Sequence, residues 1–89
     1  MDMTGKVVLV TGGGSGMGRL ACQLMSRRGA RVLALDVNEQ GLAETAAGDA
    51  GIVTRRLDVT DFAAVDAALR EAEATLGPVH RVYNAAAIM

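Results

Sequence analysis

The chain has 89 residues, of which 51% are hydrophobic and 21% charged, with a formal net charge of −1. This length allows at most one domain, and the balance of charges leaves no basic surface for nucleic acid. No apolar stretch reaches the roughly 20 residues of a membrane span, and the single cysteine, Cys22, excludes an intrachain disulfide and a zinc site of several thiolates. We expect no metal and a cytoplasmic setting.

The first third of the chain predicts a strand, a helix and a second strand. Residues 6–11 are a continuous aliphatic run, typical of a strand that is covered on both faces. After a glycine cluster, apolar residues recur at helical spacing, and Gly29 is a natural stop for this helix. Residues 31–35 predict the second strand, which ends before Asp36. The predicted apolar face of the helix consists of Met17, Leu20, Ala21, Leu24 and Met25.

The middle third predicts a short helix and a polar strand. Asn38 is placed to cap the helix, which reaches about Ala47, although Gly41 weakens its pattern. Residues 52–57 predict a strand that is more polar than the first two, because it contains a threonine and two arginines. Such a strand suits the edge of a sheet.

The last third predicts a helix and a fourth strand. Thr60 is placed to cap the helix, Gly77-Pro78 is its stop signal, and residues 81–85 predict the strand. The complete pattern is βαβαβαβ, in which right-handed crossovers imply a parallel sheet. We therefore expect part of a doubly wound, Rossmann-like α/β sheet with the strand order 3-2-1-4.

The glycine cluster, residues 11–18, lies between a predicted buried strand and an amphipathic helix. That is the context of a phosphate-binding turn, because glycines let the main chain approach a pyrophosphate and a helix N-terminus favours an anion. The usual G-x-G-x-x-G fingerprint fails, because Met17 stands at its third glycine. A P-loop fails as well, because Arg19 and Leu20 stand where lysine and a hydroxyl residue are needed.

The spacing that fits is T-G-x-x-x-G-x-G, carried by Thr11, Gly12, Gly16 and Gly18. It resembles the motif of the short-chain dehydrogenase/reductase family, and the resemblance extends over all 89 residues. Extended relatives such as nucleotide-sugar epimerases use T-G-x-x-G-x-x-G and match less well, because Ser15 stands at their second glycine. The resemblance makes residues 1–89 the N-terminal part of a single dinucleotide-binding domain.

The resemblance implies that the cofactor is NAD. Asp36 lies eighteen residues beyond Gly18, where a carboxylate accepts both hydroxyls of the adenosine ribose and repels a 2′-phosphate. Family members that prefer NADP often place a basic residue at the positions that hold Ser15 and Val37 here. Neither residue is basic, which favours NAD over NADP.

Two further segments complete the resemblance. Asp58-Val59 is similar to a pair that contacts adenine in the family, and residues 84–87 look like a variant of its Asn-Asn-Ala-Gly motif. The cofactor-binding residues predicted in this way are Gly12, Ser15, Gly16, Met17, Gly18, Asp36, Val37, Asp58, Val59, Asn84, Ala85 and Ala86.

Plainer interpretations of three of these residues remain open. Asp36 can merely end a strand or help to cap the helix at Asn38, and Asp58 can belong to an ordinary turn before Thr60. Ser15 can be a turn former rather than a phosphate ligand.

The resemblance implies an oxidoreductase that transfers a hydride between a nicotinamide and a hydroxyl or carbonyl carbon of a small molecule. The family's reaction uses a tyrosine and a lysine at the spacing Tyr-x-x-x-Lys, with a serine and an asparagine, beyond the stretch matched here. Tyr83 is the only tyrosine and Lys6 the only lysine, so we predict no catalytic residue in this chain and no activity of the chain alone.

Two further expectations concern the role of the chain and its assembly. A nucleotide-binding or interaction module without redox chemistry is the alternative function. A homo-oligomer is also expected, because the fourth strand would end the sheet as an uncovered edge.

Overall fold

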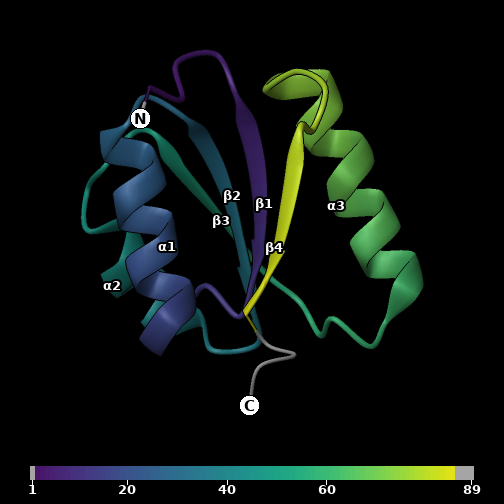
Figure 1. Cartoon of the computed structure of the whole chain (residues 1–89). Coiled ribbons are helices and arrows are strands. Elements are labelled where there is room, and N and C mark those ends of the chain that lie inside the picture. The colour runs from purple at the N-terminus through teal and green to yellow at the C-terminus, as the bar shows by residue number, and fades with distance from the viewer. Residues whose placement is uncertain (1, 86–89) are drawn as a thin grey trace.

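The computed structural model describes residues 2–85 as a parallel sheet with helices on both faces. Helices α1 and α2 lie on one side of the sheet and α3 on the other (Figure 1). The strand order is β3-β2-β1-β4, which confirms the predicted order and the doubly wound α/β fold. The elements are β1 (Val7–Thr11), α1 (Gly16–Arg27), β2 (Arg31–Asp36), α2 (Glu39–Ala46), β3 (Ile52–Arg56), α3 (Phe62–Thr75) and β4 (Arg81–Asn84).

The two central strands, β1 and β2, form the core. All five residues of β1 and the middle four of β2 are buried, as expected of aliphatic strands that are covered on both faces. Burying each such valine or leucine stabilises the fold by about 1.5–3 kcal/mol. One side of these strands packs against α1 and α2 through Val8, Val10, Val32 and Ala34. The other side packs against α3 through Leu9, Leu33 and Leu35.

The two outer strands are polar or exposed. Strand β3 buries only Ile52, and its Arg55 forms an ion pair with Glu71 of α3. The prediction that this strand lies at an edge is confirmed. Strand β4 is the other edge of the sheet within residues 2–85, and only Tyr83 of its residues is half-buried. No helix in the same residues is long and apolar enough to cross a membrane.

The N-terminus of α3 differs from the prediction. Asp61, not Thr60, is the N-cap, and its carboxylate accepts a hydrogen bond from the Ala64 N–H over 3.2 Å. Thr60 instead donates both its N–H and its hydroxyl to Asp58 Oδ1, over 2.9 and 2.7 Å. The prediction that Thr60 caps the helix was wrong, because its hydroxyl is bonded to Asp58 within the preceding turn. Asp61 therefore caps α3 instead.

The buried face of α1 also differs from the prediction. Its buried residues are Gly18 and Cys22, one turn apart, whereas Met17, Leu20 and Leu24 are 59%, 61% and 46% exposed. The predicted apolar face of α1 is thus largely exposed within residues 2–85. Gly18 and Cys22 lie against the loop that precedes α1, because the helix packs closely on that loop. The larger side chains Met17, Leu20 and Leu24 instead line a pocket beside Tyr83 of β4.

Candidate cofactor-binding site

The glycine loop, residues 12–15, joins the carboxyl end of β1 to the start of α1. It lies at the carboxyl edge of the sheet, the side on which all the parallel strands end, where β2 ends at Asp36 and β4 ends at Asn84. The connections that leave β1 and β3 run to opposite faces of the sheet (Figure 1), so this edge is a topological switch point between β1 and β4. Ligands of open α/β sheets bind at such a point.

Glycine is needed at the motif positions for two different structural reasons. Gly12 and Gly16 have φ angles of 71° and 55°, in the left-handed region that glycine tolerates best. A Cβ atom on Gly18 would stand 1.9 Å from the carbonyl oxygen of Gly12, so no side chain fits there. The spacing of the motif thus encodes a turn and the close approach of α1 to that turn.

The N-terminus of α1 is suited to an anion. Ser15 is its N-cap but makes no side-chain capping hydrogen bond, and the first turn contains no acidic residue. In α2, by contrast, Asn38 Oδ1 accepts from the Gly41 N–H over 3.0 Å, as predicted. The first N–H groups of a helix lack partners within the helix, and its dipole favours negative charge. Ser15 and Met17 are exposed at this end, where a pyrophosphate would fit.

Asp36 connects the end of β2 to the glycine loop. Its Oδ2 accepts a hydrogen bond from the Gly14 N–H over 2.9 Å, and its Oδ1 accepts from the Asn38 N–H over 3.1 Å. These bonds fix the carboxylate, and each of its oxygens keeps acceptor capacity for a hydroxyl. The carboxylate is therefore both a local structural group and a candidate ribose ligand.

A cavity of about 200 Å³ brings five of the predicted residues together. They come from the carboxyl end of β2 and from the loops that follow β1, β2 and β3. Ligand pockets for drug-sized molecules measure roughly 300–1,000 Å³, so this cavity has room for one part of a dinucleotide. Leu57, predicted as the last residue of the third strand, lies just after β3 and also lines the cavity. The lining residues are Gly12, Asp36, Val37, Leu57, Asp58 and Val59.

Asp58 lines the cavity and also forms a turn. The hydrogen bonds from the Thr60 N–H and then from the Thr60 hydroxyl lower the pKa of the Asp58 carboxyl. Asp58 is therefore a carboxylate at neutral pH, with Oδ1 committed to the turn. The plainer interpretation of this residue as part of a turn is correct, and it does not conflict with a place beside the cofactor.

The first and last motifs meet at the switch point. The Thr11 hydroxyl donates to Asn84 Oδ1 over 2.6 Å, and the two residues are paired in the register of β1 and β4. Ala85 is buried directly after β4. Ala86 lies outside the described residues.

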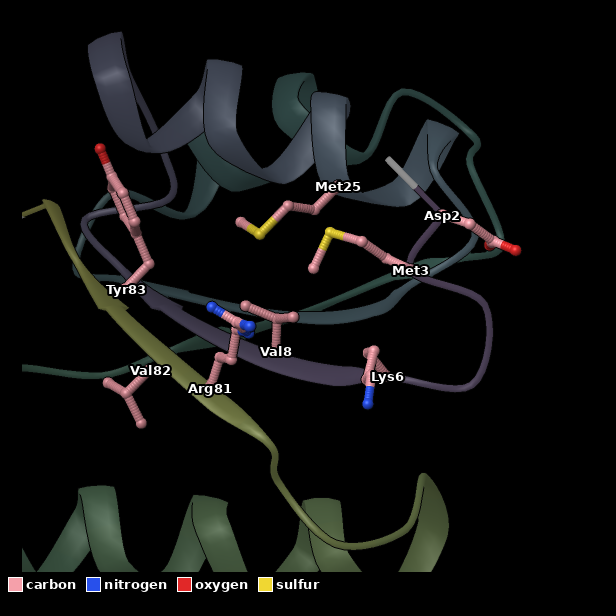
Figure 2. A pocket seen from close by; sticks show the side chains of 8 residues that line it. All are labelled: Asp2, Met3, Lys6, Val8, Met25, Arg81, Val82 and Tyr83. Carbon is pink, nitrogen blue, oxygen red and sulfur yellow. The ribbon is translucent and has the colours of Figure 1, made fainter.

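Tyr83 and Lys6 do not form a catalytic pair. Both line a second cavity, of about 560 Å³, between α1 and the strands β1 and β4. Figure 2 shows them at opposite ends of this cavity, with the Lys6 side chain pointing away from α1. Four residues along a strand span roughly 13 Å, and Tyr83 is in register with Val10, four residues beyond Lys6. This cavity contains no residue of the glycine loop and is lined in part by Met3 and Met25.

Comparison with known proteins agrees with this geometry. A family model described as short chain dehydrogenase matches residues 6–89. The chain belongs to the short-chain dehydrogenase family. Proteins of this family use a nicotinamide dinucleotide, NAD or NADP.

Several short-chain dehydrogenases are similar to this chain. It is 36% identical over 88 residues to the 2,5-dichloro-2,5-cyclohexadiene-1,4-diol dehydrogenase of Sphingobium indicum, covering 98% of this chain and 35% of that protein. It is 35% identical over 91 residues to the levodione reductase of Leifsonia aquatica, covering 96% of this chain and 34% of that protein. The crystal structure of a short chain dehydrogenase from Bacillus anthracis superposes with a TM-score of 0.86 at 27% identity, covering 92% of this chain and 34% of that chain. This chain spans about a third of the length of these relatives.

Proposed function

We propose that this chain is the cofactor-binding portion of an NAD-dependent oxidoreductase of the short-chain dehydrogenase type. The substrate would be a small molecule with a hydroxyl or carbonyl group, and the nicotinamide would supply or accept the hydride. The observation that carries the proposal is the meeting of the glycine loop, Asp36 and Asp58 around one cavity at the carboxyl edge.

Each part of the edge has a separate task in this proposal. The N–H groups at the start of α1 bind the pyrophosphate, and Asp36 binds the adenosine ribose. Asp58 and Val59 flank the adenine, while Asn84 and Ala85 border the nicotinamide side. No residue among 2–85 is proposed as the catalytic acid or base, since Tyr83 has no lysine beside it.

The preference for NAD rests on charge near the ribose. Asp36 would repel the 2′-phosphate of NADP, and neither Ser15 nor Val37 offers a positive charge. Register places Arg56 of β3 beside Asp36, and its Nε donates to the Val37 carbonyl oxygen over 3.2 Å. Removal of the carboxylate would leave this guanidinium as the local charge, which favours NADP.

Calorimetric titration of NAD and NADP into the wild type and Asp36→Ala tests the preference. The wild type should bind NAD about tenfold more tightly or better, since a hydrogen bond to a charged group contributes about 1.5–3 kcal/mol. In Asp36→Ala both affinities should fall, because Gly14 loses its acceptor. The ratio of NADP to NAD affinity should nevertheless rise. Equal affinities of the wild type for the two cofactors would overturn the assignment.

The chain by itself should show no hydride transfer. General acid and base catalysis contributes typically 10²–10⁴-fold and needs a group of suitable pKa within reach of the reacting oxygen. Purified chain supplied with NAD and a series of alcohols should leave the absorbance of reduced nicotinamide at zero. Turnover that Tyr83→Phe abolishes would contradict this and place the catalytic group in β4.

A further inference from the structure

Two residues outside the glycine motif hold the carbonyl groups of the glycine loop. Arg19 of α1 donates from Nη2 to the Gly14 carbonyl oxygen over 2.6 Å. Thr45 of α2 donates from its hydroxyl to the Gly13 carbonyl oxygen, also over 2.6 Å. Thr45 is only 1% exposed, and its hydroxyl accepts a hydrogen bond from Arg19 Nε over 3.1 Å. Two consecutive peptide groups of the loop are therefore held by one linked pair of side chains.

Gly41 lets α2 approach close enough for these contacts. A Cβ atom on Gly41 would stand 2.4 Å from the Gly14 carbonyl oxygen. The Gly41 carbonyl oxygen also lies within 3.3 Å of Arg19 Nη2 and 3.0 Å of the Thr45 hydroxyl. A glycine inside a helix is otherwise unfavourable, so its presence in this short helix is explained by packing against the loop.

Holding the carbonyl groups also orients the N–H groups of the loop. A trans peptide is planar, so its N–H points opposite to its C=O. With the Gly13 carbonyl held by Thr45, the Gly14 N–H points to Asp36 Oδ2. With the Gly14 carbonyl held by Arg19, the Ser15 N–H points away from Arg19. Ser15 is the N-cap of α1, so this is the end of the helix that is open to an anion.

We propose that Arg19 and Thr45 are positioning residues for the phosphate-binding loop, and we call the pair the loop clamp. The proposal rests on the proposed function, because it concerns how the same loop binds the pyrophosphate. The Arg19 guanidinium contacts the loop, Thr45 and Glu44, so it acts through the loop rather than on the cofactor. The loop clamp presets the direction of the N–H groups before the dinucleotide arrives, which lowers the ordering cost of binding.

Thr45→Val tests the loop clamp, because it keeps the shape of the side chain and removes the hydroxyl. The dissociation constants of NAD and of adenosine, which has no phosphate, are measured by calorimetry on the wild type and the variant. Affinity for NAD should fall about tenfold, as expected for a lost hydrogen bond that leaves a buried partner unpaired. Affinity for adenosine should fall less, by no more than about twofold, because Asp36 keeps its hydrogen bond from the Asn38 N–H and Asp58 is held by Thr60.

Two control variants separate positioning from general stability. Thr45→Ser retains the hydroxyl and should restore most of the NAD affinity. Glu44→Gln removes the ion pair with Arg19 but no contact to the loop, so it should leave NAD affinity unchanged. Should Thr45→Val fail to fold, Arg19→Met supports the same measurement, because the Arg19 side chain is 31% exposed.

The outcomes distinguish this inference from the proposed function. A folded Thr45→Val or Arg19→Met that binds NAD as the wild type does would overturn the loop clamp and leave the proposed function intact. Equal losses of NAD and adenosine affinity would also overturn it, because the effect would then be general destabilisation. A wild type that binds adenosine but not NAD would contradict the proposed function itself.

Discussion

The glycine-loop end of the molecule and the outer face of α1 with β4 are packed very differently. At the loop end, Gly13 and Gly14 are buried and their polar groups are held by side chains from α1, β2 and α2. On the outer face, Leu20 and Leu24 of α1 are 61% and 46% exposed, and the cavity of about 560 Å³ opens beside Met25 and Tyr83 (Figure 2). The loop end is therefore closely packed within residues 2–85, whereas an apolar surface of α1 stays uncovered by those residues.

The largest expected difference between the two regions is in the loss of stability when one leucine of each is replaced by alanine. Leu42 of α2 is 2% exposed in the cluster beneath the loop, and Leu42→Ala should reduce the free energy of unfolding by about 2–5 kcal/mol. Leu20 of α1 is 61% exposed, and Leu20→Ala should change it by less than about 0.5 kcal/mol. Urea unfolding of both variants measures the difference. Equal losses would mean that the outer face is as well packed as the loop end.

Adding one methyl group at the loop should abolish cofactor binding at a smaller cost in stability. Gly18→Ala places a Cβ atom against the Gly12 carbonyl, and we expect a loss of about 1–3 kcal/mol because the loop and α1 must separate. Gly48→Ala is the control, since it has a positive φ angle and nothing within 4 Å of its Cβ position. The control should lose about 1–2 kcal/mol through backbone strain and retain NAD affinity. NAD binding by Gly18→Ala at wild-type affinity would contradict the close approach.

The outer face should control self-association rather than stability. Exposed apolar patches of this kind favour association, so the wild type should sediment as a mixture whose mass and melting temperature rise with concentration. The double variant Leu20→Gln and Leu24→Gln should remain monomeric with an unchanged midpoint at low concentration. A wild type that stays monomeric at all concentrations would show that the exposed face is inert.

The most local test of the loop end is the reactivity of its buried thiol, Cys22. Burial raises the pKa of Cys22 to about 12, so the thiol stays protonated at pH 8 and should react with iodoacetamide only after unfolding. The unfolded thiol ionises near its ordinary pKa of 9.0, so stability should decline as pH rises from about 9 toward 12. Fast alkylation in native buffer would mean that the loop end opens readily, and Cys22→Ala should remove the pH-dependent part.

Local patterns predicted the strands, their order and the glycine loop. The aliphatic runs that became β1 and β2 predict strands in any context that buries both faces, and each predicted strand ends within one residue of the observed end. The motif Thr11 to Gly18 predicted the turn because glycine spacing reports backbone conformation directly. The same local chemistry predicted Asn38 as the cap of α2.

Contacts between distant elements could not be predicted in the same way. Helical periodicity identifies an apolar face but not what covers it, so it could not reveal that α1 packs through Gly18 and Cys22. The loop clamp joins Arg19 to Thr45, 26 residues apart, and no spacing rule connects them. Gly41 was the one available signal, because an isolated glycine within a predicted helix often marks a close approach.

Mapping NAD binding by amide chemical shifts tests the central claim most directly. In the ¹⁵N-labelled wild-type chain, saturating NAD should shift the amides of residues 12–18, 36–37 and 58–59 together with Asn84, all at the carboxyl edge. The amides of Met3, Met25 and Arg81, around the larger cavity, should not move. Shifts confined to the larger cavity, or none at saturating NAD, would contradict a dinucleotide site at the glycine loop.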